Sequence, residues 1–194
     1  MKSEKEDTYK KSFSSKGVFP YQKAYTLLIP LRNIFLSPKQ LIQRIELIED
    51  LHVMELGAGP GYFSIHVAKS LPKGKLILAD IQPEMLDYAK KRIDKKGLCN
   101  VDYYLCDGKK FCFDNDTLDR IYMVTVLGEV ENKELYMQEF YRILKKGGIL
   151  SISEQMGDPD KMSIAEVKEL AKNNNFTFYR LYGKERNYTI NFKK

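Results

Sequence analysis

Short apolar runs alternate with amphipathic helical stretches through the middle of this 194-residue chain. Parallel strands cannot be joined by tight turns, because each connection must cross the sheet, and the crossover is usually a helix. The alternation therefore predicts an α/β domain with a doubly wound, mostly parallel sheet and helices on both faces. The predicted strands lie at residues 52–56, 75–80, 101–106, 118–126 and 148–153, and the predicted helices at 62–71, 83–97 and 134–144.

The carboxy-terminal part of the chain breaks this rhythm. A capping box at Ser163 and Glu166 opens a helix that runs to about Lys172. Two alternating runs, at residues 176–181 and 188–192, then follow with no helix between them. Consecutive strands without a crossover pair antiparallel, so these runs predict a hairpin at the edge of the sheet.

The amino-terminal part is organised differently from the rest. Residues 1–17 are polar and charged with no periodicity, which predicts a flexible arm. Residues 18–50 are rich in aromatic and apolar side chains and predict a helical cap, in which Ser37 starts a helix that ends near residues 49–50. The main domain is then expected at residues 51–194.

Composition and charge exclude several classes of protein. Lysine and arginine number 32 against 26 aspartates and glutamates, which gives a net charge of +6. This excess is spread over the two ends of the chain rather than densely clustered, which argues against a nucleic-acid partner. The longest stretch without a charged residue is residues 56–68, and its 13 residues fall short of the roughly 20 that span a membrane.

The cysteines and the amino terminus favour a cytoplasmic protein without a metal site. The first residues lack the apolar segment of a secretory signal. Three cysteines are too few and odd in number for a disulfide framework, and their spacing is unlike that of a zinc site. They are Cys99, Cys106 and Cys112.

The most specific motif is a glycine loop, residues 55–61 (Glu-Leu-Gly-Ala-Gly-Pro-Gly), between the first predicted strand and the following helix. Its glycines permit a sharp turn and let a ligand lie against the main chain. Asp80 ends the second predicted strand, where a carboxylate can accept hydrogen bonds from both hydroxyls of a ribose. Asp107 follows the third strand and lines the same edge of the sheet.

The glycine loop departs from the fingerprint of dinucleotide-binding proteins. Tyr62 stands where that fingerprint needs its third glycine. Glu55, two residues before the first glycine, would repel a pyrophosphate and attract a cationic amino group. The residues therefore predict a nucleoside that carries an amino acid as the ligand.

From about residue 51 to residue 154 the chain resembles the class I S-adenosylmethionine-dependent methyltransferases. The resemblance is carried, in the order of that family, by the segments 55–61, 80–85, 106–108, 119–125 and 144–148. It implies S-adenosylmethionine as the cofactor. It also implies the Rossmann-like methyltransferase fold, with a seven-stranded sheet that ends in an antiparallel hairpin.

The resemblance implies roles for single residues. Glu55 would bind the methionine amine, Asp80 the ribose and Asp107 the adenine amino group. Ile81, Met85 and Gly108 would wall the adenine ring. Val124 and Thr125, at the end of the fourth strand, would lie under the methionine portion. The further positions implied for the cofactor site are Gly57, Ala58, Gly59, Gly61 and Gln82.

Methyl transfer from a sulfonium is an in-line displacement with a neutral leaving group, so alignment and exclusion of water supply much of the catalysis. A base is needed when the acceptor must lose a proton. Glu129, just after the fourth predicted strand, is the candidate base. The alternative is that Glu129 only caps the next helix at its positive end.

Two further groups are candidates for the acceptor pocket. Tyr21 and Tyr25, with Leu127, can form its wall, and the alternative for these side chains is ordinary core packing. Asp158 and Asp160 can contact the acceptor or simply open a turn.

The small, insertion-free chain favours a small-molecule acceptor. The apolar segment 18–36 suits a lipid-soluble acceptor and can also contact a membrane surface peripherally. The alternatives are an RNA methyltransferase and a non-catalytic cofactor-binding module. A DNA amino-methyltransferase is disfavoured, because residues 125–128 read Thr-Val-Leu-Gly in place of that class's Asn/Asp-Pro-Pro-aromatic motif. The sequence leaves the oligomeric state open.

Overall fold

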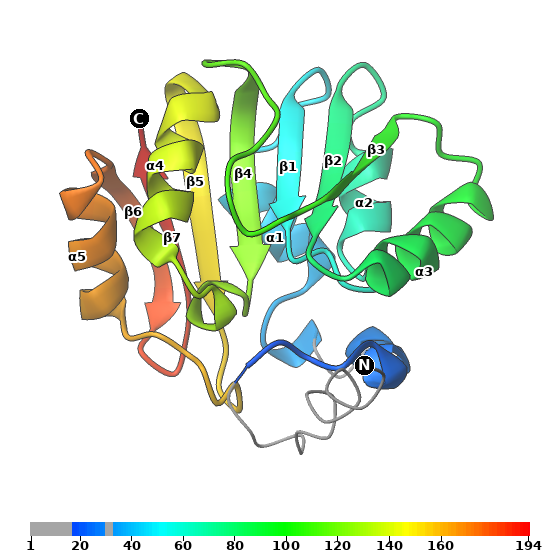
Figure 1. Cartoon of the computed structure of the whole chain (residues 1–194), viewed down its shortest axis with the longest axis horizontal. Helices are drawn as coiled ribbons and strands as arrows, with labels where there is room; N and C mark the ends of the chain where they lie inside the picture. Colours follow the sequence, from blue (N-terminus) through cyan, green and yellow to red (C-terminus); the bar gives the residue numbers. More distant parts are fainter. Residues whose placement is uncertain (1–16, 30–32) are drawn as a thin grey trace, which may run out of the picture.

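The computed structural model describes residues 17–29 and 33–194. One seven-stranded sheet has the order β3-β2-β1-β4-β5-β7-β6, in which β7 runs antiparallel to β5 and β6 and the other neighbours are parallel (Figure 1). The strands are β1 (His52–Leu56), β2 (Lys75–Asp80), β3 (Val101–Leu105), β4 (Leu118–Val124), β5 (Leu144–Glu154), β6 (Thr177–Lys184) and β7 (Asn187–Lys193). The predicted doubly wound sheet with its carboxy-terminal hairpin is confirmed.

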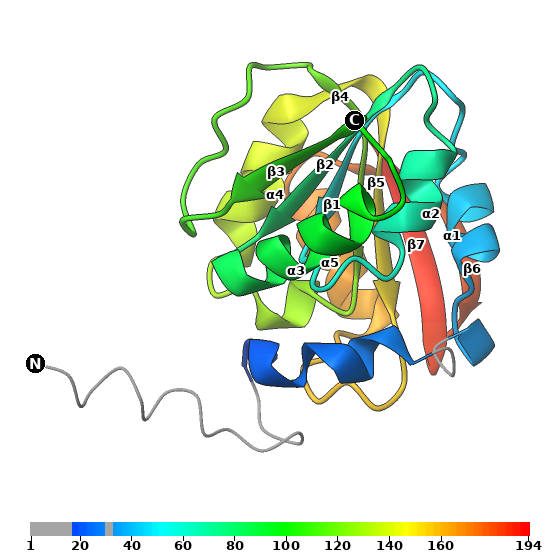
Figure 2. The same ribbon diagram turned by 90° about the vertical axis from the view of Figure 1, so that its right-hand side faces the viewer.

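Five α-helices and two short 3₁₀ helices are described around this sheet. They are η2 (Tyr21–Leu28), α1 (Pro38–Arg44), α2 (Ser64–Lys69), α3 (Pro83–Asp94), η4 (Leu127–Glu129), α4 (Lys133–Ile143) and α5 (Ile164–Asn173). Helices α1 and α2 lie on one side of the sheet and α4 on the other (Figure 2). The capping box at Ser163 and Glu166 opens α5 as the sequence predicts.

Alternate residues of the central strands serve two hydrophobic cores. In β1, Val53 joins the core under α1, α2 and α3, whereas Met54 joins the core under α4 and α5. The same division separates Tyr122 from Met123 in β4. A strand that is buried on both faces reads as a continuous apolar run, which is why the sequence pattern identifies these strands so clearly.

Helix α1 ends at Arg44 rather than near residues 49–50, so that predicted boundary was wrong. Glu46 has a φ of +51°, which breaks the helical path. Arg120 of β4 donates from Nε to the carbonyl of Ile45 at 2.8 Å and so satisfies a carbonyl at the end of the helix. This contact joins residues far apart in the chain, and local periodicity cannot report it.

The segment predicted as an amino-terminal cap divides into two parts. Leu36, Leu41 and Ile45 are buried with the α2 and α3 core, so α1 belongs to a helix layer. Helix η2 instead lies across the carboxyl ends of the parallel strands (Figures 1 and 2). Apart from Gly17, the predicted arm lies outside the described residues.

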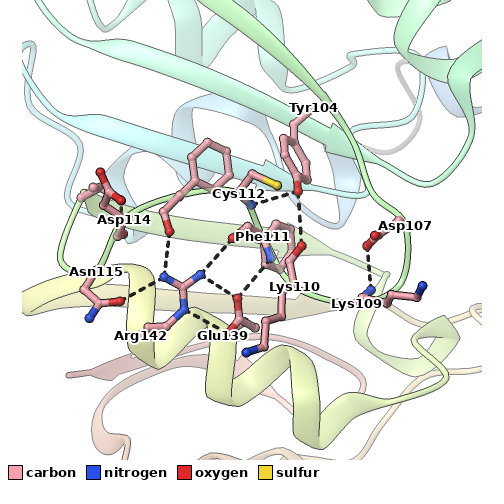
Figure 3. Close-up of polar contacts among 12 residues, drawn as sticks. Tyr104, Asp107, Lys109, Lys110, Phe111, Cys112, Asp114, Asn115, Glu139 and Arg142 are labelled. Carbon is pink, nitrogen blue, oxygen red and sulfur yellow. Dashed lines mark hydrogen bonds and ion pairs between the residues drawn. The ribbon is translucent and has the colours of Figure 1, made fainter.

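A polar cluster fixes the loop after β3 to helix α4 (Figure 3). Arg142 donates from Nη1 to the carbonyl of Phe113 at 2.7 Å and from Nη2 to that of Phe111 at 2.9 Å. Glu139, which is 4% exposed, accepts from the Phe111 N–H at 3.1 Å and from Arg142 Nη2 at 2.7 Å. These bonds to Arg142 lower the pKa of Glu139. The cluster anchors the loop that begins at Asp107.

Replacing Arg142 by methionine should lower the free energy of unfolding by about 3 kcal/mol, because it leaves the buried Glu139 carboxylate without its cation. Urea denaturation measures the loss. The matched control is Lys73→Met, which removes an exposed ion pair with Glu49 and should cost less than about 1 kcal/mol. Equal losses in the two variants would contradict the structural role of Arg142.

Candidate functional site

A cavity of about 670 Å³ opens at the carboxyl ends of β1, β2 and β4. In the sheet, β1 lies between β2 and β4, so the connections from β1 and β4 leave in opposite directions. Ligands of open α/β sheets bind in the crevice that forms at such a reversal of strand order. The cavity therefore lies where the fold itself places a ligand site.

The glycine loop turns sharply at the end of β1. Gly57 has a φ of +64°, and its N–H donates to the carbonyl of Ala79 at 2.8 Å. A Cβ at Gly57 would lie 2.4 Å from Cγ2 of Val126, so no larger residue fits. Gly59 has a φ of +51°, and a Cβ there would meet Leu27 at 3.7 Å, with no closer atom among the described residues.

Asp80 ties the end of β2 to this loop. Its Oδ2 accepts the Gly59 N–H at 2.8 Å, and its Oδ1 accepts the Gln82 N–H at 2.9 Å. Burial of the carboxyl raises its pKa, while the backbone hydrogen bonds, including one from Ile81, oppose that shift. Each carboxylate oxygen has a second lone pair, so Asp80 can still accept hydrogen bonds from a ligand in the cavity.

Glu55, at the end of β1, is 4% exposed and lines the cavity. Its Oε2 accepts a hydrogen bond of 2.5 Å from Ser64 Oγ at the start of α2. This bond holds the carboxylate beside the glycine loop. A buried carboxylate in that position can receive a cationic group of a ligand.

The third acidic position, Asp107, is exposed and lines the cavity at the end of β3. Its Oδ1 accepts the Lys109 N–H at 2.9 Å, which closes a turn after β3 (Figure 3). Gly108 follows with a φ of +78°, and within the described residues nothing lies within 4 Å of a Cβ built there. The turn therefore leaves open space beside the cavity for a flat ring.

The end of β4 carries backbone strain. Thr125 has a φ of +57°, which β-branched residues rarely adopt. Its N–H donates to the carbonyl of Ser153 at 2.8 Å, and its Oγ1 donates to the carbonyl of Val124 at 2.7 Å. These two bonds hold the turn at the floor of the cavity and end β4 two residues before the predicted boundary.

Residues 17–20, here called the strap, line the cavity. The Gly17 N–H donates to Oδ2 of Asp160 at 2.8 Å. The Phe19 N–H donates to the carboxylate of Glu129, and its carbonyl accepts from Nε2 of Gln82 at 2.8 Å. The strap is thereby attached to the loops after β2, β4 and β5.

Two carboxyls with raised pKa values lie at this end of the cavity. Burial and the charge of Asp158 raise the pKa of Glu129 to about 8, against the hydrogen bond from the Phe19 N–H. Burial, Asp158 and Glu129 together raise the pKa of Glu154, at the end of β5, to about 8. Asn132, not Glu129, caps α4, since its side chain accepts from the Leu135 N–H.

The structure gathers most of the predicted site residues around one cavity. Four do not line it: Gly61 packs toward Ala89, Leu127 is fully buried in the α4 core, Tyr25 is 65% exposed, and Tyr21 also lies outside the lining. The predicted residues that do line it are Glu55, Gly57, Ala58, Gly59, Asp80, Ile81, Gln82, Met85, Asp107, Gly108, Val124, Thr125 and Glu129.

Other lining residues were missed by sequence analysis. Leu27 of η2 and Tyr136 of α4 border the cavity, and so does Gln155 just after β5. Gln155 had a usable signal, because it ends a parallel strand at the edge where the acids of β1 and β2 also lie. Leu27 and Tyr136 are placed by packing between distant segments, for which the sequence gives no local sign.

The cavity fits a nucleoside that carries an amino acid. Gly59 and Gly108 leave open space where side chains would otherwise intrude, and carboxylates stand at three separated points along the cavity. Over the described ranges, no group of three His, Cys, Asp or Glu residues is arranged to hold a metal ion. Over the same part of the chain, no helix is both long and apolar enough to cross a membrane.

Comparisons with known proteins agree with this geometry. The model of the methyltransferase domain family matches residues 47–193. The chain is 33% identical over 104 residues to a ubiquinone/menaquinone biosynthesis C-methyltransferase, UbiE, of Hydrogenovibrio crunogenus, covering 53% of this chain and 41% of that protein. It is 35% identical over 111 residues to a protein-L-isoaspartate O-methyltransferase of Methanococcus maripaludis, covering 57% and 50%. The chain thus spans half or less of the length of these curated relatives.

Among solved structures, the fold is similar to that of a SAM-dependent methyltransferase from Aquifex aeolicus. The TM-score is 0.84 at 23% identity, over 90% of this chain and 98% of that one. At this level of identity the similarity concerns the fold. It extends over nearly the whole length of both chains.

Raised carboxyl pKa values predict that stability falls as pH rises. Between the unfolded pKa of about 4.3 and the folded value of about 8, Glu129 and Glu154 hold protons only in the folded state. The free energy of unfolding should therefore decrease from about pH 5 to about pH 9. Glu154→Gln should flatten this slope by at least about 1 kcal/mol over that range.

Chemical denaturation at several pH values measures this slope. The control is Glu169→Gln on the exposed side of α5, which should leave the slope unchanged. A slope that is the same in the wild-type protein and in Glu154→Gln would mean that Glu154 does not carry the effect.

Proposed function

The chain belongs to the methyltransferase domain family, and we propose that it transfers the methyl group of S-adenosylmethionine to a small-molecule acceptor. The observation that carries this proposal is a single cavity with two different ends. One end has the glycine loop and the buried Asp80, and the other is bordered by the strap. A cofactor and an acceptor can therefore meet inside one cavity.

The cofactor would lie along the carboxyl ends of β1, β2 and β3. Asp80 would accept the ribose hydroxyls, Glu55 would attract the amino group, and Asp107 would accept the adenine amino group. Ile81 and Met85 would flank the adenine ring. When bound, the cofactor supplies an electrophilic methyl group on a cationic sulfonium.

The chain itself contributes alignment and exclusion of water. Val126 and Phe19 are apolar residues of the cavity wall. Val126 follows the strained turn at Thr125 and contacts Gly57, and Phe19 is fixed as part of the strap. The turn at Thr125 supports the floor. A fixed approach line, with water displaced by the bound cofactor and acceptor, would accelerate an in-line displacement without an obligatory catalytic base.

Glu129 combines two tasks in this proposal. Its carboxylate accepts the Phe19 N–H and so helps to hold the strap. It also lines the acceptor end of the cavity. With a pKa of about 8, Glu129 is mostly protonated at neutral pH, and its ionised form, whose fraction rises toward pH 9, can accept a proton. Glu129 would therefore take the proton from an acceptor that must lose one.

The strap favours a small acceptor over a macromolecular one. Its hydrogen bonds to Asp160, Glu129 and Gln82 narrow the approach to the cavity at the end where the acceptor would bind. The name of the UbiE relative, a C-methyltransferase of quinone biosynthesis, supports the same class. An RNA strand would need an open, basic approach to the methyl group.

Asp80→Asn should weaken S-adenosylmethionine binding about tenfold or more, because it removes the charge that strengthens the ribose hydrogen bonds. The amide oxygen can still accept the Gly59 N–H, but the amide nitrogen would face the Gln82 N–H, so thermal denaturation has to verify that the variant is folded. Calorimetry measures the affinity. Asp102→Asn, which alters an exposed ion pair on β3, is the matched control and should bind normally. Unchanged affinity in Asp80→Asn would refute the assigned ribose site.

Incubation with methyl-labelled S-adenosylmethionine and a metabolite extract should label a small molecule, and Asp80→Asn should reduce the labelling at least tenfold at subsaturating cofactor. Chromatography after removal of macromolecules measures the label. Labelled RNA in a parallel reaction would show that the acceptor is RNA and not a small molecule. Cofactor binding without any transfer would favour the non-catalytic module instead.

A further inference from the structure

The acceptor end of the cavity is acidic although the chain as a whole is basic. Within the described part of the chain, six carboxylates and one lysine line the cavity, whereas the net charge of the chain is +6. Glu55, Asp80 and Asp107 lie along the proposed cofactor path. The remaining carboxylates belong to the loops after β4 and β5, where the acceptor would bind.

Glu129 and Asp158 are the two partly buried carboxylates of that group. Both line the same cavity, and the charge of Asp158 raises the pKa of Glu129. Oδ1 of Asp158 accepts the Asp160 N–H at 3.0 Å, which fixes the loop that carries it. Two like charges held together in a concave site favour a cationic ligand between them.

Glu154 lies beneath these two carboxylates and adds negative charge when it ionises, at a pKa of about 8. It is 1% exposed, and neither carboxylate oxygen has a hydrogen-bond partner among the residues described. Lys161 partly offsets its charge, but Lys161 Nζ donates to the carbonyl of Glu185 and does not line the cavity. The single lysine that lines the cavity, Lys109, follows Asp107 in the loop after β3.

Gln155 supplies an independent sign of a ligand. This side chain lines the cavity, is 7% exposed, and its Nε2 has no hydrogen-bond partner within the described residues. A buried N–H without a partner costs free energy comparable to a lost hydrogen bond. A ligand with a hydrogen-bond acceptor at this point would remove that cost.

We propose that the methyl acceptor is an amine, whose nitrogen lies against the carboxylates of Glu129 and Asp158 and whose neighbouring oxygen accepts from Gln155 Nε2. This inference rests on the proposed function and specifies its substrate class. An ammonium would be held by charge-assisted hydrogen bonds from its N–H groups. A carboxylate, or a phenol that must ionise, would be repelled by the negative charge at the same position.

The chemistry of transfer to an amine balances with the residues present. The bound ammonium first gives a proton to the Glu129 carboxylate, which frees the nitrogen lone pair. That pair forms the new N–C bond to the methyl carbon as the C–S bond breaks, and the C–S electrons remain on the sulfur, which becomes neutral. The product is a methylammonium, and Glu129 returns its proton to water.

Three probes of matched shape test the charge preference of this end of the cavity. Benzylamine, benzyl alcohol and benzoate are titrated by calorimetry into the full chain saturated with S-adenosylhomocysteine at pH 8, where about half of Glu129 is ionised. Benzylamine should bind at least tenfold more tightly than benzyl alcohol, and benzoate should bind most weakly. Prior binding of S-adenosylhomocysteine tests the proposed cofactor site separately.

Variants assign the preference to the named carboxylates. Glu129→Gln and Asp158→Asn keep the size of each side chain, and each should reduce the advantage of benzylamine over benzyl alcohol about tenfold. Asp102→Asn, on an exposed part of β3, should leave it unchanged. Thermal denaturation verifies that each variant is folded.

Two results would overturn the amine proposal while the proposed function stands. The first is normal binding of S-adenosylhomocysteine with equal or stronger binding of benzyl alcohol or benzoate, or with no binding of benzylamine at millimolar concentration. The second is methyl label from a fractionated extract that enters only neutral or anionic compounds. Failure to bind S-adenosylhomocysteine would instead overturn the proposed function and, with it, this inference.

Discussion

The hydrogen bonds between the Asp80 carboxylate and the backbone of the glycine loop are the constraint on which the site depends. Oδ2 takes the Gly59 N–H at 2.8 Å, and Oδ1 takes the Gln82 N–H at 2.9 Å, so one side chain joins β1, β2 and the start of α3. Because Gln82 in turn donates to the carbonyl of Phe19, the same junction reaches the strap. The two ends of the cavity are therefore parts of one connected structure.

Local chemistry made the sheet and the cofactor end of the cavity predictable from the sequence. Strands β1 and β2 are buried on both faces, and β1 is followed by a glycine while β2 ends in an aspartate. The end of each apolar run in the sequence therefore coincides with the end of the strand. The glycine loop and Asp80 are near one another in the chain, and the order of strands follows from the crossover rule. Val126 approaches Gly57 so closely that the fold itself requires glycine at this position, independently of any ligand.

Contacts between distant segments decided what the sequence could not predict. Arg120 ends α1 early through the Ile45 carbonyl, and Leu127 is turned into the α4 core rather than the cavity. Aromatic spacing in the amino-terminal segment pointed to Tyr21 and Tyr25, yet η2 directs Leu27 to the cavity and leaves Tyr25 in solvent. The three-residue period of a 3₁₀ helix differs from the α-helical period, so the aromatic spacing in the sequence selects the wrong inward face.

The attachment of the strap also bears on how quickly ligands exchange. Three hydrogen bonds hold it, and at about 1 kcal/mol each they amount to about 3 kcal/mol. A detached state would then be populated in about one molecule in a hundred, and loop motions of this kind occur in microseconds to milliseconds. Under the proposed function, the strength of these bonds would therefore set how quickly product is released, with the sheet remaining folded.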